Sequence, residues 1–180
     1  VQGKHGDKAE AKKAEGQGAQ KGRQTGGRVL SVEEAAAALK DLKNKLGVAP
    51  EGLIEGKNGA LNYNPANILE IADALNTLVA AHGEGYNLFT DPFMGPERTM
   101  LTRVILGKGD KYTLGWFHHE VGEAGLLRGR SGLPGPLYLL AQDQAHIDIQ
   151  RAQGNSSVDI YHPSVVRAYD RQFGPAFPRY

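Results

Sequence analysis

The sequence of 180 residues contains no cysteine. This absence excludes a disulfide framework, a zinc site built from cysteine thiolates and a catalytic thiol nucleophile. It also makes the fold independent of the redox state of its surroundings, so such a domain could fold outside one cell and again inside another.

Long apolar runs are missing as well. The sequence has no stretch of about 18 apolar residues, so no membrane-spanning segment is predicted. The chain starts at Val1 and shows no signal-peptide pattern, which leads us to expect a processed product or part of a larger parent protein. Hydrophobic residues make up 40% of the chain and charged residues 23%, as is typical of a globular domain with its own core.

The charged residues are spread unevenly, although the net charge is only +1. Residues 1–28 hold seven Lys and Arg against three Asp and Glu and almost no large apolar side chains, which predicts a flexible basic linker. We expect one compact domain over residues 29–180. Within it, residues 29–97 hold four basic and ten acidic residues, and residues 98–180 hold ten and seven. This mildly basic second half is compatible with a nucleic-acid backbone but does not require one.

Capping patterns predict where two helices begin. The segment 31–34 (Ser-Val-Glu-Glu) has the capping-box pattern and predicts a helix to about residue 46, which Gly47 closes. The dipeptide at 64–65 (Asn-Pro) predicts the start of a second helix, with an apolar stripe and an end at Gly83.

The rest of the domain is expected to combine helices with a small antiparallel sheet. The expected elements are, in order, a loop over 84–99, strands over 100–106 and 112–116 joined at 107–110, a helix over 116–127, a loop over 128–136, a helix over 137–153, a short strand over 158–161 and a last helix over 164–173. The predicted fold class is therefore α+β: a mostly helical single domain around a small antiparallel sheet.

Polar side chains gather on one side of the helix expected over 116–127. His119 and Glu123 are one helical turn apart, and Glu120 lies three residues before Glu123. No Lys or Arg occurs between residues 112 and 127. Two partly buried carboxylates without a local cation would raise each other's pKa. A bound metal ion, or an Arg from elsewhere in the fold, would remove that penalty.

The helix expected over 137–153 offers a partner face, because Asp143 and His146 lie on one stripe. If the two helices pack together, His119, Glu123 and His146 come within reach of one metal ion. Two histidines and one carboxylate form a known catalytic zinc set. Asp143 could then fix the imidazole tautomer of His146.

Two further residues are candidates for proton transfer. Glu120 could be the general base that takes a proton from a metal-bound water, and His162 could be a fourth ligand or a general acid. The pattern His119-Glu120-x-x-Glu123 departs from the zinc-protease pattern His-Glu-x-x-His at its last position. Two other readings stay open: an ordinary helix pair with His146 as a core histidine, and a metal-free acid–base site.

Other candidates carry less weight. Arg128 and Arg130 flank a glycine-rich loop and could hold a phosphate, although a solvated loop is the simpler interpretation. Glu55 and Lys57 have the Glu-x-Lys spacing of some metal-dependent nucleases, without a clear acidic strand before them. His118 is expected to be exposed.

Three segments resemble the C-terminal toxin domains of bacterial polymorphic toxins, of the contact-dependent growth inhibition, Rhs and haemagglutinin types. They are FHHEVGEAGLL (117–127), AQDQAHIDIQRAQG (141–154) and IYHPSVV (160–166). The resemblance implies a cytotoxic effector, most often a nuclease, that is secreted within a larger carrier, delivered into the target-cell cytoplasm and neutralised by a cognate immunity protein. The active residues that it implies are His119, Glu120, Glu123, His146 and His162.

These observations leave three hypotheses. The first is a cytotoxic metal-dependent hydrolase that acts on nucleic acid. The second is a metal-dependent peptidase or amidase. The third is a non-enzymatic binding or assembly domain, in which the polar cluster is a structural network. The expected cofactor of the first two is a divalent metal ion such as Zn²⁺.

Overall fold

The computed structural model describes residues 24–25, 28–48 and 63–177. Its elements are β1 (Gln24–Thr25), β2 (Arg28–Val29), α1 (Val32–Leu46), α2 (Pro65–Ala81), the 3-10 helix η2 (Pro92–Met94), α3 (Gly95–Ile105), α4 (Lys111–Leu126), α5 (Gly135–Gln153), α6 (Ser157–Ile160) and α7 (Pro163–Phe173). None of these helices combines the length and the apolar character that crossing a membrane requires. Most of the expected linker over 1–28 lies outside the described residues, and so do Glu55 and Lys57.

The first two helices begin where their capping patterns predict. The hydroxyl of Ser31 accepts the backbone amide of Glu34 at 3.1 Å, and the Glu34 carboxylate accepts the amide of Ser31 at 2.8 Å. The helix α1 then ends at Gly47, whose φ of 71° is a left-handed conformation that glycine adopts without strain. At α2, the Asn64 side chain accepts the amide of Ala66 at 2.9 Å.

The expected α+β fold is wrong, because the described part of the chain is 71% helical and its core contains no sheet. The strands β1 and β2 form only a two-residue antiparallel ladder ahead of α1, with Gln24 opposite Val29. Residues 100–106 and 112–116, expected as a hairpin, lie instead in α3 and α4 and at the turn between them.

Helix-ending and helix-starting signals explain this difference. Gly107 has a φ of 71° and follows the last residue of α3 and its C-cap, while Asp110 caps α4 by accepting the amide of Thr113 at 3.0 Å. The segment 107–110 is therefore the connection between two helices. The β-branched residues before and after it favoured strands, but tertiary packing outweighs such propensities.

A second expected strand, over 158–161, is also helical. It forms the single turn α6, which begins with a capping box between Ser156 and Asp159. The Asp159 carboxylate accepts the Ser156 hydroxyl at 2.7 Å and the Ser156 amide at 3.2 Å. These two bonds satisfy the start of the turn locally and favour helix over strand.

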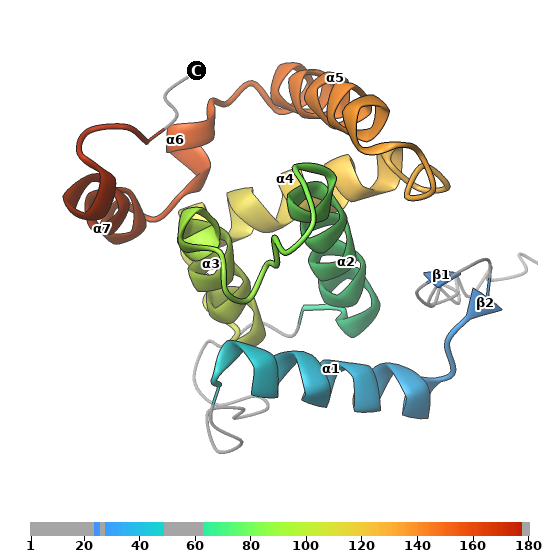
Figure 1. Ribbon diagram of the computed structural model, residues 1–180. Coiled ribbons are helices and arrows are strands. Elements are labelled where there is room, and N and C mark those ends of the chain that lie inside the picture. The colour runs from blue at the N-terminus through green and yellow to red at the C-terminus, as the bar shows by residue number, and fades with distance from the viewer. Residues whose placement is uncertain (1–23, 26–27, 49–62, 178–180) are drawn as a thin grey trace, which may run out of the picture.

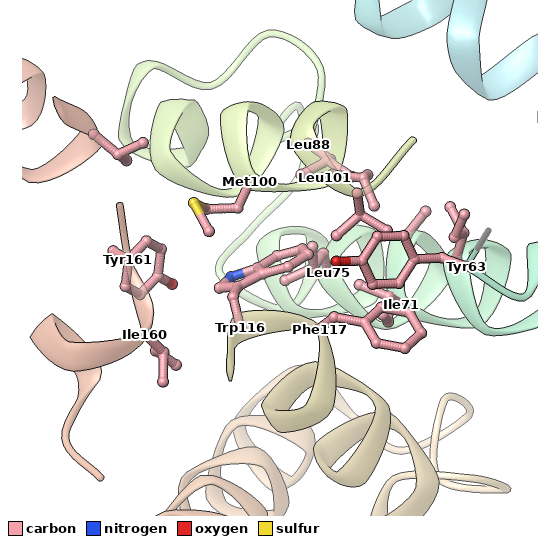
Figure 2. Close-up of a cluster of buried hydrophobic side chains, with 14 of the residues drawn as sticks. Tyr63, Ile71, Leu75, Leu88, Met100, Leu101, Trp116, Phe117, Ile160 and Tyr161 are labelled. Carbon is pink, nitrogen blue, oxygen red and sulfur yellow. The ribbon is translucent and has the colours of Figure 1, made fainter. Parts of the chain in front are cut away.

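Helix α4 lies at the centre of the domain, in contact with α2, α3, α5 and α6 (Figure 1). Helix α1 packs across α2 and α3 on one side, and α7 packs against α3. Figure 2 shows Trp116 and Phe117 reaching from α4 toward Ile71 and Leu75 of α2 and toward residues of α3. Trp116 is fully buried, and each large side chain buried in this way contributes about 1.5–3 kcal/mol to folding.

Candidate metal centre

Helix α4 carries polar side chains into the interior on the side that faces α5. His119, Glu120 and Glu123 are exposed by only 0%, 8% and 6%. Trp116 and Phe117 anchor the preceding turn in the core, so the orientation of the polar residues is fixed. His118 is exposed, as the sequence predicted.

His119, Glu123 and His146 bring three atoms together in a nearly equilateral triangle. The Nε2 atom of His119 lies 3.1 Å from Oε2 of Glu123 and 3.0 Å from Nδ1 of His146. The third side, from Nδ1 of His146 to Oε2 of Glu123, measures 3.1 Å. The packing of α4 against α5, on which the predicted site depended, is therefore confirmed.

Hydrogen bonding alone cannot satisfy all three sides of this triangle. Burial alone would raise the pKa of Glu123, but interactions with His119, His146 and Gln142 hold that pKa at about 2, so its oxygens only accept. If both imidazoles donate to Glu123, two N–H groups face each other at 3.0 Å. If one imidazole accepts, its lone pair faces the carboxylate oxygen at 3.1 Å. One side is thus always repulsive, which is costly in a buried site.

A metal ion resolves this conflict, because all three atoms can then direct a lone pair at one positive charge. Ligand atoms bound to one ion at about 2.0–2.2 Å lie roughly 3.0–3.5 Å apart, and the observed spacing falls in that range. Among the described residues, His119, Glu123 and His146 are the group that could hold a metal ion, with ligand atoms within 4.8 Å of one another. Two imidazoles and a carboxylate suit several divalent transition metals.

The second oxygen of Glu123 has its own partner. The side-chain amide of Gln142 donates to Oε1 of Glu123 at 2.8 Å, which leaves Oε2 directed at the two histidines. Gln142 lies one turn before His146 on α5, so helical spacing could have predicted its position beside the site. The Nδ1 atom of His119 is buried and has no hydrogen-bond partner among the described residues.

Two glycines allow the helices around the site to approach closely. A Cβ atom on Gly122 of α4 would lie 2.7 Å from Cδ1 of Ile149 on α5. A Cβ atom on Gly135, in the first turn of α5, would lie 2.6 Å from the carbonyl oxygen of Ala81 at the end of α2. The Ile149 side chain can rotate its end away from a new Cβ atom, but the Ala81 carbonyl belongs to the backbone, so a side chain at Gly135 would displace α5 from α2.

Glu97, on α3, is a partly buried carboxylate that the sequence did not reveal. The hydroxyl of Tyr161 donates to its two oxygens at 2.6 and 2.8 Å, and the Trp116 indole N–H donates at 3.3 Å. Figure 2 shows the ring of Tyr161 facing the indole of Trp116. Burial raises the pKa of Glu97 to about 7, although both hydrogen bonds lower it. No spacing rule links Glu97 with Tyr161, because 64 residues separate them.

Glu120 interacts electrostatically with both Glu97 and Glu123. Its pKa is raised well above the usual value, first by burial and then by the charges of Glu123 and Glu97. The expected repulsion between carboxylates raises the pKa of Glu120, but the expectation is wrong for Glu123, whose pKa is lowered by its contacts with the two histidines of the triangle and Gln142. Glu120 is not one of the three candidate ligands.

A cavity of about 640 Å³ borders the candidate metal centre. His146, Gln142 and Asp143 line it from α5, and Glu97 and Tyr161 line it from the opposite side. The remaining lining consists of His82, Gln150 and a set of apolar and aromatic side chains: Leu78, Phe93, Pro96, Leu139, Ile147, Tyr169 and Phe177. The cluster therefore has an adjoining space in which a substrate could meet the face of His146.

Of the predicted site residues Asp143 and His162, only Asp143 lines the cavity. Asp143 is exposed and lines the cavity one turn before His146. His162 does not line the cavity, because it caps α7: its Nδ1 atom accepts the amide of Ser164 at 3.2 Å and lies 2.7 Å from the Ser164 hydroxyl. The neighbouring Tyr161 is the residue of this segment that reaches the site.

The two predicted phosphate-binding arginines do not join the cluster. Arg128 forms a two-pronged ion pair with Glu70 of α2, at 2.7 and 3.1 Å. Arg130 is exposed in the turn after α4. Neither arginine lines the cavity.

Comparison with protein families, curated proteins and solved structures finds no match for this chain. The resemblance to toxin domains therefore stays a prediction, and the functional argument depends on the geometry of the site.

Proposed function

We propose that this domain is a metal-dependent hydrolase whose zinc ion is bound by His119, Glu123 and His146. The observation that carries the proposal is the triangle of ligand atoms, 3.0–3.1 Å apart, beside a cavity. Two histidines and one carboxylate are the protein ligands of several catalytic zinc sites. An ion held there would act as a Lewis acid and lower the pKa of a water molecule.

The proton of the attacking water needs an acceptor, and we assign that role to Glu120. Its carboxylate is buried, directly follows the proposed ligand His119 in the sequence and is not part of the ligand triangle. A carboxylate in that position can take up a proton from water as a general base. Gln142 has a positioning role, because its bond to Oε1 of Glu123 keeps Oε2 directed at the histidines.

The proposed biological role is that of a cytotoxic effector. In this proposal a larger carrier delivers the domain into the cytoplasm of a target cell, and a cognate immunity protein neutralises it. Support comes from the resemblance of segments 117–127, 141–154 and 160–166 to polymorphic toxin domains. The lack of cysteine also fits a domain that refolds after delivery. Nucleic acid is the substrate class that this resemblance suggests.

Expression in bacteria tests the proposal, with wild type compared with Glu120→Gln and with Glu84→Gln as an exposed control. We expect wild type and Glu84→Gln to arrest growth. Glu120→Gln should be harmless yet fold normally and bind one zinc ion per chain, as measured by mass spectrometry of metal content. RNA, DNA and protein from arrested cells would show which polymer is degraded.

Two outcomes would contradict the hydrolase. One is a purified wild-type protein that binds no divalent metal. The other is unchanged activity in Glu120→Gln and Glu123→Gln together with lower stability, which is what a structural polar network predicts.

A further inference from the structure

The cavity beside the candidate metal centre has an acidic lining, which is unusual for an enzyme that acts on nucleic acid. Among the described residues, no Lys or Arg lines it, and its lining carboxylates are Glu97 and Asp143. Proteins that bind nucleic acid place Lys and Arg along the phosphate backbone, and these contacts supply most of the non-specific affinity. The cavity offers no such contacts to a phosphate chain.

A bound divalent ion would lie among His119, Glu123 and His146, so Glu97 and Asp143 would still be the acidic groups of the cavity lining. Desolvation makes the ionised form of Glu97 costly, and a cation entering the cavity would offset part of that cost.

The nearby arginines are already engaged. The Arg98 guanidinium donates to the carbonyl oxygens of Leu88 at 2.8 Å and Asp91 at 2.6 Å. Arg128 pairs with Glu70, at the end of α4 away from the cavity lining. Neither cation is directed into the cavity, so the acidic lining stays unbalanced by these groups.

Apart from two histidines and two glutamines, apolar and aromatic side chains form the rest of the cavity. Phe93, Tyr169 and Phe177 provide rings from three different segments, and Leu139 and Ile147 add aliphatic surface from α5. Such a lining favours an apolar body, and an aromatic ring can also contact a cation through its face.

We propose that this cavity binds a substrate with an apolar body and a cationic group, namely a peptide that carries a basic side chain. The cationic group would pair with Glu97 and Asp143, and the scissile bond would be an amide. Hydrolysis then consumes one water: its oxygen bonds to the carbonyl carbon, the C–N bond breaks, and the nitrogen leaves as an amine with the transferred proton. This inference rests on the proposed hydrolase, because it takes the cavity as the substrate site.

Three small probes that share an apolar phenylethyl group but differ in charge test the inference directly. They are 2-phenylethylamine (cation), 3-phenylpropionamide (neutral) and 3-phenylpropionate (anion). The chain has a single tryptophan, Trp116, whose indole donates to Glu97, so its fluorescence reports binding. We expect the cation to bind about tenfold or more tightly than the anion in metal-free protein, where no zinc ion can bind the carboxylate of the anion.

Matched variants identify the groups responsible. Glu97→Gln keeps an acceptor for Tyr161 and Trp116 but removes the charge, and should lower the preference for the cation about tenfold. Asp143→Asn, at an exposed position, should lower it by up to about fivefold. Asp148→Asn is the control, because Asp148 is also exposed on α5 but does not line the cavity. Tighter binding of the anion, or a preference unchanged in both Glu97→Gln and Asp143→Asn, would overturn the inference.

Cleavage assays show whether a negative result contradicts the peptide inference or the proposed hydrolase itself. Zinc-loaded protein should cleave a fluorogenic peptide containing Lys about tenfold faster than the same peptide containing Glu, and should leave a 20-nucleotide RNA intact. Cleavage of the RNA alone would overturn the peptide inference and keep the hydrolase. If the protein cleaves neither the peptide nor the RNA, this result contradicts the proposed hydrolase. The binding of the charged probes still shows which charge the cavity prefers.

Discussion

The Nε2 atom of His119 lies 3.0 Å from the Nδ1 atom of His146, although 27 residues separate these side chains in the sequence. The two atoms share a neighbour, Oε2 of Glu123, at 3.1 Å from each. Such a contact needs a proton or a cation between the rings. Metal binding therefore distinguishes the candidate centre from an ordinary hydrogen-bonded core.

Zinc should bind and stabilise the protein through His146. We expect His146→Ala to abolish tight zinc binding in calorimetric titrations. In wild type, zinc at a hundred times its Kd should add about 2.7 kcal/mol to the free energy of unfolding. His118→Ala is the control, because this neighbouring histidine is exposed on α4. An equal rise in melting temperature with zinc in His146→Ala and wild type would refute the assigned ligand set.

The grouping of the three candidate ligands was largely predictable, because helical periodicity determines which face each residue occupies. His119 and Glu123 are four residues apart on α4, and His146 lies on the inward face of a helix whose length was clear from the sequence. Only the packing of α4 against α5 had to be assumed, and the structure confirms it.

The remaining parts of the site could not be found by spacing. The sequence predicted Glu97 to lie in a loop, whereas it lies in the first turn of α3 and accepts a hydrogen bond from the distant Tyr161. The error in fold class has the same origin, since strand propensity over 100–116 was given more weight than Gly107 and Asp110. Contacts over such sequence distances depend on tertiary packing, which local patterns do not encode.

Gly135→Ala should destabilise the domain. The new Cβ atom would lie 2.6 Å from the carbonyl oxygen of Ala81, and this atom belongs to the backbone, so α5 must move away from α2. We expect a loss of about 1–3 kcal/mol in urea unfolding, with weaker zinc binding because α5 carries His146. Gly132→Ala is the matched control, since a Cβ atom there meets nothing within 4 Å. Equal stability of the two variants would contradict the close approach.

Asp110→Ala should weaken the start of α4. The Asp110 carboxylate accepts the amide of Thr113 at 3.0 Å, the hydroxyl of Thr113 at 2.8 Å and the guanidinium of Arg103 at 2.7 Å. We expect a loss of about 1–2 kcal/mol in the free energy of unfolding. Asp110→Ser should recover part of it, because serine caps helices but cannot form the ion pair.

The same carboxylate should contribute to acid sensitivity. Burial alone would raise the pKa of Asp110, but its bonds to Thr113 and Arg103 outweigh burial and lower it below the usual value. Its stabilising contribution is therefore present above the unfolded pKa of 3.8 and is lost as the pH falls below that value. Urea unfolding at pH 6 and at about pH 3 should show a smaller acid-induced loss in Asp110→Ala than in wild type. An identical loss would remove Asp110 from this role.

Glu97 should give the metal-free protein the opposite pH dependence. Burial raises its pKa from 4.5 to about 7, so between these values the folded state holds a proton that the unfolded state has lost. The free energy of unfolding should therefore fall as the pH rises from about 4.5 to 7, by at most about 3 kcal/mol. Glu97→Gln cannot ionise and should make this decline smaller, while the part that comes from the raised pKa of Glu120 remains. Glu84→Gln, at an exposed turn position, should keep the whole decline. Urea unfolding in EDTA at pH 5, 6, 7 and 8 measures the slope, and a wild-type slope retained in Glu97→Gln would place the titrating group elsewhere.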